Sequence, residues 1–176
     1  MSNSISGQIN CNLNLKNTYP ATSGSFAESV NLGQVALQIT GGTGINQCNE
    51  MWSSTLSLAA ATTTLDLTNL TGIGSRVVTF SAIKVLYIVN NDSVAAHSVA
   101  VGNGASTPWY APFSASTHTH TIPGGASGAT ATSGGTPFLI TNLTAAGWAV
   151  DGSHNLLMLD PGANTVSVTI LIAGLA

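Results

Sequence analysis

Two histidines give the sequence its clearest opportunity for metal chemistry. His118 and His120 lie two residues apart, so in an extended strand both imidazoles would face the same side. A zinc or nickel ion would need one or two more ligands, from His97, from His154 or from other copies of the chain. The other residues of 117–121 are all threonine, which is typical of an exposed loop. We therefore predict no metal site here.

The residue types of nucleophilic catalysis are present, but no spacing combines them into a known site. The sequence has no Gly-x-Ser-x-Gly elbow, and neither cysteine lies in a nucleophile signature. The six carboxylates show no pairing typical of glycoside hydrolysis. The glycine-rich residues 41–44 lack the Gly-Lys-Ser/Thr ending of a phosphate loop, so a β-turn explains them better. We predict no catalytic residues and no cofactor, and therefore a protein that is not an enzyme.

Aromatic residues before a long loop are the better candidates for a contact surface. Trp109 and Tyr110 are flanked by Pro108 and Pro112, and aromatic anchors are enriched at interfaces. Trp148 lies in an alternating segment and is predicted to pack in the core. The predicted partner-contacting residues are Trp109, Tyr110, Phe113, His118 and His120.

Alternation of apolar and polar residues predicts short strands along most of the chain. The predicted strands are 5–15, 35–39, 65–70, 83–90, 97–101, 137–141, 148–151 leading into 156–159, and 165–172. Residues 83–90 are expected to form a central strand with 97–101 as its hairpin partner, and a turn at 160–164 is expected to join the last two strands as another hairpin. Residues 46–61 fit either a short helix or an irregular strand.

This pattern predicts an all-β protein, an antiparallel β-sandwich of the jelly-roll type, built as one domain over residues 1–176. A long loop at 114–136 is almost wholly Ser, Thr, Ala and Gly. We expect it to supply no core and to act as a partner-contacting arm, since loops of such length are usually functional or disordered.

The chain is unusually poor in charge. Asp, Glu, Lys and Arg make up 5% of the residues, whereas about 25% is typical of soluble domains. The basic residues are only Lys16, Arg76 and Lys84, so no positive patch can neutralise phosphates, and we predict no nucleic-acid partner. Interface cores are depleted of Lys, Glu and Asp. A nearly uncharged surface therefore favours burial against neighbouring proteins.

No apolar run approaches the roughly 20 residues of a membrane helix, so we predict no membrane partner. Residues 1–5 lack the basic start and apolar core of a secretion signal, and we expect synthesis and assembly in a cytoplasm. Cytoplasmic assembly disfavours a disulfide between Cys11 and Cys48, although pairing stays open. We predict two buried free thiols.

Several phrases of the sequence are familiar in combination. They are Gly-Thr-Gly-Ile-Asn-Gln at 42–47, Leu-Asp-Leu at 65–67, the apolar segment 80–90, Gly-Trp-Ala-Val-Asp at 147–151 and the closing segment 168–174. In these the chain resembles small jelly-roll virion proteins of tailed bacteriophages. The resemblance covers nearly the whole length and implies a capsid decoration or cement protein that forms trimers on the shell.

We therefore expect a structural virion protein, a capsid cement or decoration subunit made in the host cytoplasm. It would bind the outer surface of the major capsid protein lattice as a homotrimer and stabilise the shell. The alternative is a fibre, spike or tail-associated adhesion module that binds host surface glycans through Trp109, Tyr110 and the long loop. A third alternative is self-assembly into a filament or shell without another partner.

Overall fold

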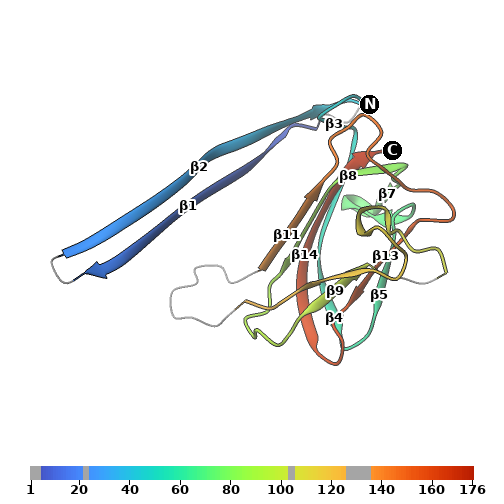
Figure 1. Ribbon diagram of the computed structural model, residues 1–176. Helices are drawn as coiled ribbons and strands as arrows, with labels where there is room; N and C mark the ends of the chain where they lie inside the picture. The colour runs from blue at the N-terminus through green and yellow to red at the C-terminus, as the bar shows by residue number, and fades with distance from the viewer. Residues whose placement is uncertain (1–4, 22–23, 103–105, 126–135) are drawn as a thin grey trace.

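Two antiparallel sheets form the body of the protein, and a long two-stranded arm projects from it (Figure 1). The computed structural model describes residues 5–21, 24–102, 106–125 and 136–176, with the backbone alone for 11–35. In these ranges the regular elements are strands and two short 3-10 helices, η1 (Ile73–Ser75) and η2 (Ala111–Phe113). No helix among the described residues is long and apolar enough to cross a membrane.

The larger sheet has five strands, in the order β11-β8-β14-β4, with the short β12 also paired to β8. All of its pairs are antiparallel. Its strands are β4 (Glu50–Ala59), β8 (Ala82–Asn90), β11 (Thr136–Thr141), β12 (Trp148–Ala149) and β14 (Thr165–Leu175).

The smaller sheet has four antiparallel strands, in the order β10-β9-β13-β5. They are β5 (Thr63–Asp66), β9 (Val99–Gly102), β10 (Thr119–Ile122) and β13 (Leu156–Asp160). A separate two-stranded ribbon joins β6 (Leu70–Thr71) to β7 (Val77–Val78).

The core lies between the inner faces of these two sheets. From Thr165 to Ile172 of β14 the buried residues occur at every second position, as the period of a strand requires. They share one apolar cluster with the inward residues of the smaller sheet. The fully buried members from β14, β9 and β13 are Val166, Val168, Ile170, Ile172, Val99, Val101, Leu157 and Leu159. Burial of this alternating set is what holds the two sheets face to face.

The arm consists of β1 (Gly7–Ala21) and β2 (Gly24–Gly41), paired antiparallel from Gly7 opposite Ile39 to Ala21 opposite Gly24. A register shift near Asn12 and Asn14 marks a β-bulge. At about 3.3 Å per residue, the 15 residues of β1 extend about 50 Å. Within the described chain, β1 pairs only with β2, and β2 gains a second partner only where its end meets β3 (Gln47–Cys48) in parallel. The rest of the ribbon stands away from the body (Figure 1).

The predicted all-β class with antiparallel sheets is confirmed. The predicted central strand is also confirmed, because β8 is an interior strand of the larger sheet with β11 and β14 beside it. The ambiguous segment 46–61 forms strands, most of it β4, with Trp52 and Leu58 turned into the core.

Both predicted hairpins are wrong. The segment predicted to pair with β8 forms β9, which lies in the smaller sheet between β10 and β13. Likewise β13 and β14 belong to different sheets, so the turn after Asp160 carries the chain across the core. The reason is common to both cases. Alternation identifies the buried face of a strand but does not identify the strand beside it.

The expectation that 114–136 supplies no core is wrong at one residue. Strand β10 lies within this segment, and Ile122 at its end is fully buried in the main cluster. A single apolar residue after the three exposed residues of β10 is too short a pattern for the period of a strand to be read. Residues 126–135, the remainder of the predicted loop, lie outside the described residues.

Candidate functional site

The outer face of the five-stranded sheet is a wide surface without an Asp, Glu, Lys, Arg or His side chain. Its residues alternate with the core residues on the same strands, and each is either apolar or carries a hydroxyl group. On β4, β8, β11 and β14 these outward residues are Met51, Ser53, Thr55, Ser57, Val85, Tyr87, Val89, Pro137, Leu139, Thr141, Thr165, Ser167, Thr169, Leu171 and Ala173. We call this surface the outer face. Covering it would desolvate no charge apart from that of any partner.

The outer face has an apolar half and a hydroxyl half. Beside the base of the arm, Tyr87, Leu139 and Leu171 lie on neighbouring strands in register. Further along the sheet the surface becomes a ladder of hydroxyls, with the Oγ1 atoms of Thr55 and Thr169 3.2 Å apart. Met51 and Leu139, both in the apolar half, are 45% and 37% exposed.

A hollow of about 440 Å³ lies where the base of the arm meets the outer face. Ile9 and Ile39 line it from the arm, and Tyr87, Leu139 and Leu171 line it from the sheet. Below it, Ile39 forms a small cluster of its own with Val85, Ala173 and Cys48. The arm therefore rests on the outer face through one of its two faces, the one that carries Ile9 and Ile39.

Lys84 anchors the base of the arm. The register of β8 and β14 shifts at this point, leaving Lys84 opposite no residue of β14. Its side chain is 0% exposed, and the Nζ atom donates hydrogen bonds to the carbonyl oxygens of Gly44 at 2.7 Å and Gln47 at 2.8 Å. Gly44 lies in the turn between β2 and β3, and Gln47 is the first residue of β3. A buried cation thus ties the end of the arm to the larger sheet.

The same corner holds a buried thiol. Cys48 is free and fully buried, as predicted for it, and burial raises the pKa of its thiol, an effect that the charge of Lys84 opposes. A raised thiol pKa lowers the fraction of thiolate at neutral pH, so the group is a poor nucleophile. The side chain of Cys11, the other predicted free thiol, lies outside the described residues.

The predicted contact residues around η2 divide into a core group and a surface group. Trp109 is 1% exposed, and its Nε1 atom donates a hydrogen bond to the Ala149 carbonyl oxygen at 3.0 Å. Its ring packs edge-on against Phe113 and Trp148, with centroids 6.4 Å and 6.3 Å away. Trp109 is therefore part of the core, and Phe113 is half-buried against it.

His118, His120 and Tyr110 lie nearer the surface. The imidazole of His120 stacks on Phe138 with centroids 4.3 Å apart, while Nδ1 of His118 lies 2.9 Å from the Phe113 carbonyl oxygen. Both histidines line a shallow polar hollow beside β10 together with Phe113. Tyr110 lies half-buried against His154, away from this hollow. Among the described residues, no three His, Cys, Asp or Glu side chains gather closely enough to hold a metal ion.

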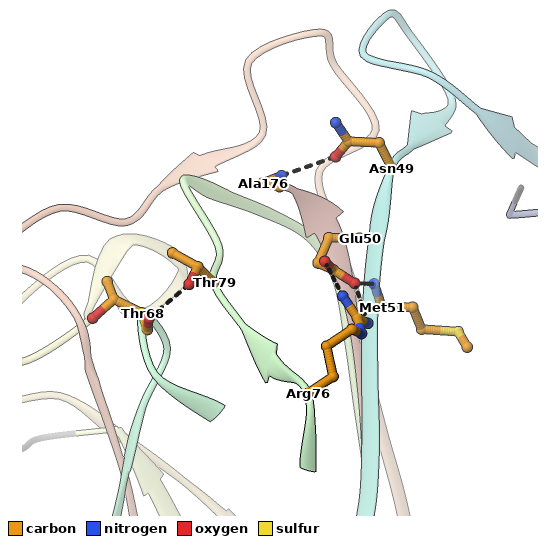
Figure 2. Close-up of polar contacts among 7 residues, drawn as sticks. All are labelled: Asn49, Glu50, Met51, Thr68, Arg76, Thr79 and Ala176. Atoms are coloured by element: carbon orange, nitrogen blue, oxygen red, sulfur yellow. Dashed lines mark hydrogen bonds and ion pairs between the residues drawn. The ribbon is translucent and has the colours of Figure 1, made fainter. Parts of the chain in front are cut away.

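The carboxylate of Glu50 forms a bidentate ion pair at the edge of the larger sheet (Figure 2). The guanidinium of Arg76 donates to both carboxylate oxygens of Glu50, at 2.7 Å and 2.8 Å. These hydrogen bonds lower the pKa of the Glu50 carboxyl. Near them the hydroxyl of Thr79 donates to the Thr68 carbonyl oxygen at 2.9 Å. The pair ties the loop before β7 to the start of β4 and leaves neither partner free for acid-base chemistry.

Three aspartates stabilise turns. Asp66 accepts hydrogen bonds from Thr68 and from the Asn155 amide, which lower the pKa of its carboxyl. Asp92 and Asp151 each accept a bond from a backbone N–H two residues ahead, and these bonds likewise lower their pKa values. All three are typical turn contacts, in which an Asp side chain receives local backbone donors.

Sequence reasoning missed the arm and the outer face. The predicted strands 5–15 and 35–39 are its two ends at the body, and nothing was assigned between them. The register pairs Leu15 with Val30 and Tyr19 with Phe26, but alternation breaks at the bulge and at Asn17. The low charge of the sequence predicts a surface that a partner could cover, but it does not indicate which strands form that surface.

Comparison of the chain with models of known protein families, with curated proteins and with solved structures finds no match.

Proposed function

We propose that this protein is a structural subunit of a bacteriophage virion, a capsid cement or decoration protein that binds the outer surface of the major capsid protein lattice. Its role is to be covered by neighbours and to hold them together, without catalysis. The proposal includes a homotrimer made in the host cytoplasm and a body of jelly-roll type, in which the two sheets form a β-sandwich.

The uncharged outer face is the observation that carries this proposal. A sheet surface of apolar and hydroxyl residues is suited to a protein interface, because its burial removes no charged side chain from water. The arm adds a second surface about 50 Å long, part of which rests on the body, and such a length is suited to bridging subunits of a lattice. The scarcity of basic residues favours the outside of a shell over its genome side.

The test is binding to shells of the phage that encodes the chain, assembled without it. The purified protein is expected to co-sediment with these shells at saturating stoichiometry and to raise the temperature at which they release DNA. The test variant, Leu139→Glu, places a charge in the apolar half of the outer face. Its matched control, Ser57→Glu, places the same charge at the edge of the hydroxyl half. Absence of the protein from the shell pellet at any concentration would reject the proposal.

The glycan-binding alternative rests on fewer residues than the sequence suggested. Sugar stacking needs an accessible aromatic face, and the burial of Trp109 withdraws the largest candidate. Tyr110, which lies half-buried beside His154, is the aromatic residue that remains for sugar stacking in this alternative. A glycan array with Tyr110→Ala as control distinguishes the two functions, since glycan binding lost in the variant would favour an adhesion module.

A further inference from the structure

Two histidines at the start of β10 lie on the face of that strand that is turned towards the core. His118 directly precedes β10 and His120 is its second residue, so both lie at alternate positions with Ile122, which is fully buried. Unlike Ile122, both histidines are exposed, and both line the hollow of about 540 Å³ beside β10. On an extended strand their Cα atoms are about 7 Å apart. Two imidazoles at this spacing are able to converge on one point in the hollow.

Each of these imidazoles is held by a phenylalanine that packs against the main core. Nδ1 of His118 lies 2.9 Å from the Phe113 carbonyl oxygen. Because a carbonyl oxygen only accepts hydrogen bonds, Nδ1 carries the proton and donates, which in the neutral ring leaves the lone pair on Nε2. The ring of His120 stacks on Phe138 with centroids 4.3 Å apart and an interplanar angle of 19°. Phe113 and Phe138 both pack against the buried cluster, so both imidazoles are oriented before a ligand binds.

The contact of His118 with a backbone carbonyl is typical of metal-binding histidines. A ligating imidazole donates its second N–H to a carbonyl oxygen or a carboxylate, which fixes the tautomer and orients the free nitrogen towards the metal. Among the described residues that line the hollow, none is an acid, a lysine or an arginine. The hollow therefore offers imidazole nitrogen without the carboxylates that Ca²⁺ and Mg²⁺ prefer, and without a positive side chain to repel a cation.

We propose that His118 and His120 together bind one divalent transition metal ion of the class that prefers imidazole, Cu²⁺, Ni²⁺ or Zn²⁺. Nε2 of His118 is one ligand, and a ring nitrogen of His120 is the other. Because the described residues contain no group of three His, Cys, Asp or Glu side chains at this place, water takes the remaining coordination positions. The sequence alone predicts no metal site, since the threonine-rich segment 117–121 reveals neither the hollow nor the two phenylalanine contacts.

The test is isothermal titration calorimetry of the full-length chain, without an affinity tag, with NiCl₂ in a buffer that does not bind metals. Wild type is expected to bind one Ni²⁺ per chain, to release it to EDTA, to bind Cu²⁺ more tightly and not to bind Mg²⁺. His118→Gln and His120→Gln each remove one ligand and are expected to weaken Ni²⁺ binding more than about tenfold. His154→Gln, the same substitution at a partly exposed histidine beside Asp151, is the matched control and should bind like wild type. Near-UV circular dichroism checks that every variant is folded.

Electron paramagnetic resonance of the chain loaded with Cu²⁺ identifies the ligands. The wild-type spectrum is expected to show two coordinated imidazole nitrogens, and the spectra of His118→Gln and His120→Gln at most one. A wild type that binds no Ni²⁺ at millimolar concentration would overturn the proposal. Wild-type affinity in either of these variants, or its loss in His154→Gln, would also overturn it, because the ion would then lie elsewhere. The inference does not rest on the proposed function, so failure to bind shells leaves it standing.

Discussion

Strands β14 and β1 share one pattern in the sequence but occupy opposite situations in the structure. Both alternate apolar with polar residues, as Val166-Ser167-Val168 and Asn12-Leu13-Asn14 illustrate. The apolar positions of β14 are covered by the smaller sheet, whereas β1 belongs to a ribbon that leaves the body. The comparison teaches that alternation identifies the face of a strand on which apolar residues gather, but does not identify which layer of the chain, if any, lies over that face.

The largest expected effect on stability comes from a substitution in β14, the strand of this comparison whose apolar residues are covered. Ile170→Ala removes a fully buried side chain of β14 and leaves a cavity that the two sheets cannot close. The free energy of unfolding is expected to fall by about 2–5 kcal/mol, measured by chemical denaturation. Ser167→Ala, an exposed position of the same strand, is expected to change it by less than about 0.5 kcal/mol. Equal losses would mean that β14 does not bury the face assigned to it.

The second effect concerns the junction between body and arm. Lys84→Met removes the ammonium group that donates hydrogen bonds to the carbonyl oxygens of Gly44 and Gln47, so both oxygens lose this donor. Because hydrogen bonds to a buried charge are strong, unfolding is expected to become easier by about 2–3 kcal/mol. Lys16→Met, the same substitution at an arm position, serves as the control. An equally large loss of stability in the control would show that Lys84 does not stabilise the junction through these two hydrogen bonds.

A smaller and pH-dependent effect is expected at the ion pair. The pKa of Glu50 is lowered in the folded protein, so its stabilising effect is complete above the pKa of a free glutamate, about 4.3. The effect is lost as the pH falls through the lower folded pKa. Glu50→Gln should therefore reduce the melting temperature at pH 7 and leave little difference from wild type near pH 2. Glu28→Gln in the arm is the matched control, and a deficit that persists unchanged in acid would contradict the account.

The smallest effect on the body is expected from the arm itself. Leu15→Ser changes a position of β1, a strand that pairs only with β2 among the described residues, so it should alter the unfolding of dilute protein by less than about 0.5 kcal/mol. The same substitution at Leu157, which is fully buried in the smaller sheet, should cost several times more. If Leu15→Ser destabilised the dilute chain as strongly, the arm would have a partner within its own body.

The sequence predicted the strands and much of the core because both depend on local alternation. Val168, Ile170 and the interior strand β8 carry that pattern clearly. Strand neighbours escaped prediction, since β9 and β14 could pair with several strands at equal local cost. Ile122 was missed because one apolar residue makes no period, and Lys84 because its acceptors are carbonyl oxygens about 40 residues away in sequence.

The surface residues were the least predictable part. Trp109 follows Pro108 and precedes the long loop, a context that suggested exposure, but the Ala149 carbonyl oxygen satisfies its indole N–H inside the core. The low charge of the chain indicated that some surface is meant to be covered. Only the fold shows that one sheet face carries no Asp, Glu, Lys, Arg or His side chain and that the arm begins beside it.

Hydrogen–deuterium exchange of the full-length chain, measured at low and high protein concentration, tests the central claim most directly. The account predicts that amides of β14 exchange slowly at both concentrations. Amides of β1 and β2 beyond the base should exchange rapidly in dilute protein and become protected at concentrations at which the proposed homotrimer forms. Arm amides that exchange at one rate across the whole concentration range would contradict the proposal that this protein acts by being covered by its neighbours.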